Sequence, residues 1–270
     1  MKIQFPLRFF TAATLILNLL TTISIPHATA LSFAPRRQFY QLLIYHVKDK
    51  TQETTTDKYL AESWLPALHR AGIDKIGVFK TLGIDTATDK KIYVLTAYKS
   101  LDQFHKVTRL LRNDQELGRS GLIYLDAKFD APPYLRKESI LMEAFTGMPV
   151  WKAPDFAAPK SERIYELRSY ESATEKLYNS KVHMFNEGNE MEIFERIGSQ
   201  PLFYGEVLAG SRMPNLMYMT TYSNKKSRDE HWKLFGNDPA WKRLAALPEY
   251  QHNMQKADIY LLVPADYSDL

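Results

Sequence analysis

The chain has 270 residues, a formal net charge of +4 at pH 7 and no cysteine. The lack of cysteine excludes disulfides and thiolate chemistry, and a nearly neutral chain without a clustered basic face argues against a nucleic-acid partner. The sequence also lacks a phosphate-binding glycine loop, a Gly-x-Ser-x-Gly turn and the Cys/His spacing of zinc sites. Phosphoryl transfer, serine hydrolysis and zinc hydrolysis are therefore set aside, and we expect neither a metal nor a tightly bound cofactor.

Residues 1–30 have the pattern of a signal peptide. A start with two basic residues is followed by a mostly apolar run at residues 9–25, and then by the small residues Ala28 and Ala30 that a signal peptidase recognises. The run is short for a membrane span, although an uncleaved anchor is the alternative. We expect export to the periplasm or the cell exterior, a mature chain that begins near Leu31, and no integral membrane span in that chain.

The rest of the chain carries the same pattern twice, about 125 residues apart. An offset that stays nearly constant over three separate segments indicates two copies of one folding unit. Two copies in one polypeptide predict an internal pseudo-twofold interface. The matching segments are residues 40–45 with 165–170, 68–72 with 194–198, and 94–98 with 218–222.

Copy one, residues 31–147, shows the periods of strands and helices in the order β-α-β-β-α-β. Its helices are expected to be capped by Thr56-Asp57 and by Ser100, and Gly72 is expected to end the first. The expected strands are residues 39–47, 75–82, 91–98 and 139–145, and the expected helices run through residues 59–68 and 104–111.

Copy two, residues 161–270, repeats this order after a proline-rich linker at residues 148–160. Its expected strands are residues 163–170, 202–208, 215–222 and 259–263, and its expected helices are residues 174–197 and 226–235.

A β-α-β-β-α-β unit is a ferredoxin-like fold, with both helices on one face of a four-stranded antiparallel sheet. The other face of each sheet is left bare, and two such sheets in one chain can cover each other. The sequence therefore predicts an α+β fold in which two tandem ferredoxin-like repeats form a pseudo-symmetric dimeric α/β barrel. A cavity is expected between the two sheets.

Copy two carries a set of residues that resembles the NIPSNAP family. The resemblance implies the dimeric α/β-barrel fold, and the arrangement looks like exported bacterial members with tandem domains. Copy one departs from the family pattern, with Gln41 and Leu43 where the family has Glu and Arg, so it looks like a degenerate partner. The matching residues of copy two are Tyr165-Glu166-Leu167-Arg168-Ser169-Tyr170, then Arg228 and Trp232, then Asn237-Asp238-Pro239-Ala240-Trp241.

The resemblance does not imply a mechanism. Proteins with this fold include cofactor-free monooxygenases, haem-degrading enzymes and plain ligand binders, and a shared fold does not fix a function.

The first strand of copy two supplies the candidate site. Alternation separates Tyr165 and Leu167, assigned to the helix-packed face, from Glu166, Arg168 and Tyr170, assigned to the cavity. Arg168 either forms a structural ion pair with Glu166 or holds an anionic group of a ligand. The residues expected to line the cavity are Arg168, Tyr170, Tyr45 and Thr220.

The helix of copy two offers a second candidate. His183 and Glu187 are spaced as metal ligands can be, with Glu190 one turn further on, but Gly188 interrupts the helix and no second histidine is near. We therefore interpret these residues as structural or solvated. His183 at the cavity mouth, acting as an acid or base, is the alternative.

The closing family motif has a local explanation. Asp238 is expected to cap a helix that Pro239 opens, with Trp241 packed inward, and Trp232 is spaced for packing in the core.

Three functions stay open on the sequence alone. The first is binding of a small, partly apolar or anionic ligand between the sheets. The second is a cofactor-free enzyme of monooxygenase or isomerase type, with Glu166 or His183 as base and Arg168 stabilising an oxyanion. The third is an interaction module whose cavity is filled by side chains. The sequence leaves undecided whether the chain is an enzyme and whether it forms a homo-oligomer.

Overall fold

The computed structural model describes Met1 and residues 36–270. The predicted signal peptide and its cleavage site therefore lie outside the described residues, apart from Met1. Residues 36–270 lie in one compact unit. Within the described part of the chain, no helix is both long and apolar enough to cross a membrane.

Eight antiparallel strands close into a barrel in the order β1-β3-β2-β8-β5-β7-β6-β4. Around the ring, β4-β1-β3-β2 is followed by β8-β5-β7-β6, so each half has the same strand order. The halves join through β2 with β8 and through β4 with β6. The strands are β1 Phe39–Val47, β2 Ile76–Thr81, β3 Lys90–Tyr98, β4 Arg136–Ala144, β5 Ile164–Glu171, β6 Gln200–Ala209, β7 Asn215–Tyr222 and β8 Lys256–Pro264.

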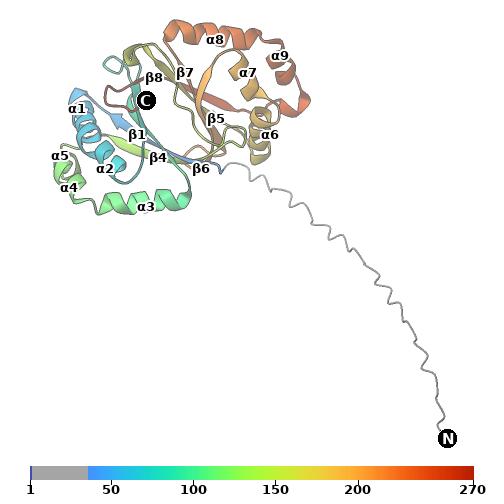
Figure 1. Cartoon of the computed structure of the whole chain (residues 1–270). Coiled ribbons are helices and arrows are strands. Elements are labelled where there is room, and N and C mark those ends of the chain that lie inside the picture. The colour runs from blue at the N-terminus through green and yellow to red at the C-terminus, as the bar shows by residue number, and fades with distance from the viewer. Residues whose placement is uncertain (2–35) are drawn as a thin grey trace. The chain divides into compact units, whose positions relative to one another are not determined.

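Helices cover the outside of the barrel in two groups, one for each half (Figure 1). The first group is α1 Lys50–Tyr59, the π-helix η1 Leu60–Trp64, α2 Leu65–Arg70, α3 Leu101–Arg112, α4 Gln115–Ser120 and α5 Leu122–Leu125. The second group is α6 Glu175–Asn186, α7 Glu190–Arg196, α8 Lys225–Asn237 and α9 Pro239–Ala245, with the 3-10 turns η2 Lys160–Glu162 and η3 Pro248–Tyr250.

The helix ends differ from the sequence expectation at two places. Asp49 caps α1 by accepting a hydrogen bond from Gln52 N, so the expected cap at Thr56-Asp57 was wrong. The helix expected over residues 174–197 is two helices, because Asn189 adopts the left-handed conformation (φ 64°) between them. Ser100 caps α3 as expected.

Three layers of side chains make up the core. The barrel interior is one layer, and the outer face of each half forms another with its helices. Large rings fill the interior, where Tyr40 lies 5.1 Å from Phe203 and Phe79 lies 4.6 Å from Tyr165, measured between ring centroids. An eight-stranded barrel is just wide enough to be filled in this way.

The two faces of β5 are reversed relative to the expectation. Tyr165 and Leu167 lie inside the barrel and are fully buried, whereas Glu166, Arg168 and Tyr170 lie under the helices of the second half. Alternation separates the two faces of a strand but does not say which one points inward. The charged face was assigned to the interior, and the interior is instead filled mainly by apolar and aromatic side chains.

Candidate functional site

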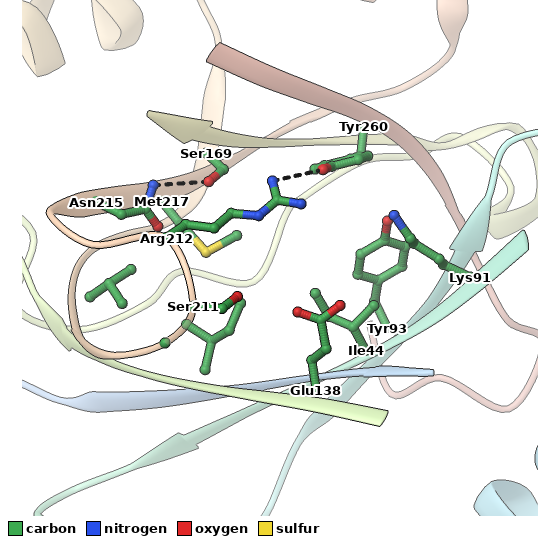
Figure 2. Close-up of a pocket in the computed structure, with 13 residues that line it drawn as sticks. Ile44, Lys91, Tyr93, Glu138, Ser169, Ser211, Arg212, Asn215, Met217 and Tyr260 are labelled. Carbon is green, nitrogen blue, oxygen red and sulfur yellow. Dashed lines mark hydrogen bonds between the residues drawn. The ribbon is translucent and has the colours of Figure 1, made fainter. Parts of the chain in front are cut away.

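The barrel interior leaves little free space. A pocket at one end of the barrel has a volume of about 20 Å³, room for about one water molecule (Figure 2). Polar pairs close that end: Asn215 Nδ2 donates to Ser169 Oγ at 2.9 Å, and Arg212 donates to Tyr260 Oη at 3.2 Å. The expectation of a ligand-sized cavity between the sheets was therefore wrong.

Glu166 lies at the centre of a hydrogen-bond network beneath α8. Its side chain is fully buried, and it accepts hydrogen bonds from Arg168 Nε at 2.6 Å, Arg228 Nε at 2.5 Å and Trp232 Nε1 at 2.8 Å. Both carboxylate oxygens are used, so the buried charge is fully satisfied. Four residues of the family motif, which are far apart in the sequence, thus form one structural unit.

Arg168 has no free donor face for a ligand. Its guanidinium stacks on the Trp232 ring, with Cζ 3.6 Å from the ring centroid, and it also donates to Tyr170 Oη at 3.0 Å. Tyr170 Oη lies 2.8 Å from Tyr218 Oη. This geometry supports the structural ion pair rather than an anion site.

Two further polar contacts lie in the second half. Lys181 and Glu190 form a buried ion pair at 2.8 Å, and burial raises the pKa of Glu190 while Lys181 opposes that shift. Thr220, one of the predicted lining residues, is buried on the helix side and accepts a hydrogen bond from Tyr222 at 3.0 Å.

His183 is exposed on α6 and lies 2.8 Å from the hydroxyl of Tyr250, far from any enclosed cavity. The described residues contain no group of three or more His, Asp or Glu side chains placed to hold a metal ion. Asp238 caps α9 as expected, accepting from Ala240 N at 2.8 Å and Trp241 N at 3.2 Å. Asn237 ends α8, and Pro239 opens α9.

A second pocket lies in the first half, between the outer face of the barrel and the helices. We call it the first-half pocket; its volume is about 360 Å³. It continues into a shallower hollow around residues 127–135, and the two share four lining residues. The lining residues are Gln41, Leu43, Tyr59, Trp64, Tyr98, Thr108, Leu111, Arg112, Asp114, Leu117, Gly118, Leu125 and Lys137.

Lys137 is a cation of this pocket that has aromatic neighbours and no ion-pair partner among residues 36–270. It lies on β4 directly opposite Tyr45 of β1, and its Nζ is 5.2 Å from the centroid of the Tyr45 ring and 5.7 Å from that of Trp64. The residue is accessible because the pocket is open, yet the surrounding protein lowers the pKa of its amine by desolvation. Among residues 36–270, no carboxylate forms an ion pair with it.

Trp64 supplies a second polar group without a partner. It is the last residue of the π-helix η1, and such turns occur frequently at functional sites. Its Nε1 is buried and has no hydrogen-bond acceptor within the described chain. Every buried donor of this kind costs free energy unless a ligand or water accepts from it.

Aromatic rings build the wall around these two donors. Tyr59 stacks on Tyr124 at 3.7 Å between centroids, and Tyr45 meets Tyr134 edge to face at 5.7 Å. A cation in an aromatic wall can bind a planar apolar body that carries a negative charge.

One charge at the other end of the pocket, that of Asp114, is already paired. Asp114 accepts from Arg70 at 2.8 Å and from Leu117 N at 2.9 Å, where it caps α4. Asp114 is therefore committed to the fold, which leaves the lining cations Lys137 and Arg112 as candidates for contact with a ligand.

Sequence reasoning missed Lys137 and Trp64. Of the predicted lining residues, only Tyr45 lies beside this pocket, and it does so on the helix side rather than in the barrel. The departure of copy one from the family pattern could have pointed to this pocket, because Gln41 and Leu43 both line it.

The NIPSNAP family model matches residues 165–269. These residues form a NIPSNAP domain. The domain contains the Glu166 network and α8 and α9, whereas the open pocket lies in the preceding half of the barrel. No curated protein matches the chain.

Solved structures resemble all or part of the chain at low sequence identity. A protein of Fusobacterium nucleatum proposed to be a monooxygenase is 9% identical, with a TM-score of 0.56 over 85% of this chain and 93% of that one. A second such protein, from Lactobacillus acidophilus, is 9% identical, with a TM-score of 0.54 over 85% and 94%. A NIPSNAP family protein of Agrobacterium tumefaciens is 19% identical over 44% of this chain and 97% of its own, with a TM-score of 0.36. At these identities the likeness concerns the fold alone.

Proposed function

We propose that the chain binds a small, planar, partly apolar acid in the first-half pocket. The observation that carries the proposal is Lys137, a cation without an ion-pair partner among residues 36–270, beside the Trp64 ring in one aromatic-walled pocket of about 360 Å³. That volume falls in the range of small-molecule sites. The apolar walls would hold the body of the ligand and Lys137 its acidic group.

In this proposal the two halves of the barrel have different roles. The NIPSNAP domain closes the barrel and is held rigid by the Glu166 network, while the other half holds the ligand. We further propose that the halves are tandem ferredoxin-like copies, since they have the same strand order.

We also propose that the protein is exported after cleavage near Leu31. Measurement of the intact mass of the protein from its own host tests this proposal.

A cofactor-free oxygenase or isomerase is the second candidate. The lowered pKa of Lys137 favours it, because a neutral amine in an apolar pocket can remove an acidic proton from a bound substrate. Two proteins of the same barrel fold are proposed monooxygenases. This candidate uses the same pocket, so both functions require Lys137.

Calorimetric titration with 2-naphthoate tests the binding proposal. Changing Lys137 to Met keeps an unbranched apolar side chain and removes the charge, so affinity is expected to fall about tenfold or more, as for loss of a charged hydrogen bond. The matched control is Lys106→Met, at an exposed lysine on α3 outside the pocket. Equal affinity in all three proteins would contradict the proposal.

A further inference from the structure

Lys137, which is accessible through the open pocket, differs from three cations of the second half in what surrounds its nitrogen. Arg168, Arg228 and Lys181 each contact a carboxylate within 3 Å. Lys137 Nζ faces two aromatic rings, and no described residue accepts a hydrogen bond from it. An amine without an ion pair is free to act as a nucleophile once it loses its proton.

We infer that Lys137 forms a reversible imine with an aromatic aldehyde or ketone bound in the first-half pocket. The inference rests on the proposed function, because it uses the same pocket, and it adds aromatic carbonyl compounds to acids as a second ligand class. In the reaction, the neutral Nζ adds to the carbonyl carbon, and a C–N bond forms. The C=O π bond breaks as this bond forms, and one proton moves from the nitrogen to the oxygen to give a carbinolamine. The hydroxyl group of the carbinolamine then takes a proton from solvent and leaves as water, and the C=N bond of the protonated imine forms with no oxidant or reductant required.

The geometry favours the protonated imine over the ammonium ion when the pocket is filled. A lysine ammonium has three N–H donors, and in the open pocket solvent must accept from them. A ligand body that fills the pocket excludes this solvent, and within the described chain nothing replaces it. A protonated imine has a single N–H donor, so its burial leaves fewer donors unsatisfied.

The aromatic rings around Nζ also stabilise the positive charge of the protonated imine. The imine nitrogen occupies the place of Nζ, over the faces of Tyr45 and Trp64, where the rings attract a cation. Desolvation of the amine, which lowers its pKa, increases the fraction of neutral nucleophile at a given pH. The pocket therefore favours both the reacting form and the product.

Reductive trapping tests the inference. The full chain is incubated with 2-naphthaldehyde and cyanoborohydride near neutral pH, and the modified lysine is found by peptide mapping. We expect Lys137 to be labelled before the exposed Lys106, and Lys137→Arg, which keeps the charge, to lose this early label. Labelling of Lys137 no faster than Lys106 would overturn the inference.

A parallel titration with 2-naphthoate separates this result from failure of the proposed function. If 2-naphthoate binds and Lys137 is not labelled, the pocket binds acids and the imine inference is wrong. If 2-naphthoate does not bind and the aldehyde labels all exposed lysines alike, the proposed function and the inference both fail. Mapping of the unchanged protein keeps the test valid even if a variant folds poorly.

Discussion

Gln41 of β1 and Glu166 of β5 occupy matching places in the barrel, since Gln41 pairs with Thr96 and Glu166 pairs with Thr220. Glu166 is fully buried and accepts from Trp232 and two arginines, whereas Gln41 lines the first-half pocket. In the second half, this position holds the hydrogen-bonded Glu166 carboxylate under the helices. In the first half, the same position borders the open pocket. The departure from the family pattern at Gln41 thus coincides with the appearance of a pocket.

Changing Arg168 to Met is expected to destabilise the fold. The change removes one of the three donors to the buried Glu166 carboxylate, and loss of a partner from a buried pair costs about 3–5 kcal/mol. Urea denaturation measures the loss. The double variant with Glu166→Gln should recover part of it, because no buried charge then remains unpaired. An unchanged unfolding free energy for Arg168→Met would show that the network contributes no stability.

Filling the pocket at Gly118 is expected to block binding without loss of stability. A Cβ at this helical position meets nothing within 4 Å and would point into open space. Gly118→Leu should therefore weaken 2-naphthoate binding, and replacing a helical glycine should stabilise the fold by about 0.5–1 kcal/mol.

Gly236 in α8 offers the matched control for Gly118. It is also helical and also has nothing within 4 Å, but it lies in the other half of the barrel. Gly236→Leu should raise the melting temperature as Gly118→Leu does and leave the affinity unchanged. Weaker binding in both variants would locate the site elsewhere.

Trp64→Phe keeps an aromatic ring and removes the indole N–H that lacks an acceptor in the described chain. If that donor binds the acid, the binding free energy for 2-naphthoate should become less favourable by about 1.5–3 kcal/mol. This is the usual contribution of a hydrogen bond to a charged group. Affinity for 2-methylnaphthalene, which has no acidic group, should stay the same. A parallel fall for both compounds would mean that only ring packing matters.

Acid binding is expected to weaken with rising pH below the usual lysine range. Desolvation lowers the pKa of Lys137, so its ammonium loses its proton, and with it the attraction to a carboxylate, earlier than an ordinary lysine. Burial raises the pKa of Tyr59 and Tyr124, so both stay neutral through this window. The Leu117 amide lowers the pKa of Asp114, which stays charged throughout. A pH-independent affinity up to the normal lysine pKa would contradict the assignment.

Neither half of the barrel is expected to be stable alone. A fragment of residues 160–270 would expose the inner face of β5, β7 and β8, which carries Tyr165, Leu167, Met219 and Leu262, all fully buried in the whole chain. An exposed apolar face of this kind exceeds what a soluble monomer usually tolerates. Size-exclusion chromatography should therefore find aggregates or a self-dimer. A monomer that unfolds cooperatively would show that the interior contributes less than the packing suggests.

The sequence predicted the elements well because their periods are local properties. The strand positions, the caps at Ser100 and Asp238, and the packing of Trp241 all follow from residues close in the chain. The orientation of β5 does not follow from residues close in the chain. Whether Glu166 points into or out of the barrel depends on donors from α8, about sixty residues later, and alternation alone carries no such information.

The site was harder to predict than the fold. Lys137 lies in a run of four polar residues, Arg136-Lys137-Glu138-Ser139, where no local pattern separates the inward from the outward side chains. Its importance comes from what faces it across β1 and from η1, both more than seventy residues earlier in the chain. Only the closed barrel brings these rings to the same nitrogen.

A crystal structure of the chain with 2-naphthoate tests the central claim most directly. The account predicts the naphthyl ring in the first-half pocket, with its carboxylate within hydrogen-bond distance of Lys137 Nζ and an unchanged Glu166 network in the other half. A carboxylate bound by Arg168, or a ligand inside the barrel, would contradict it.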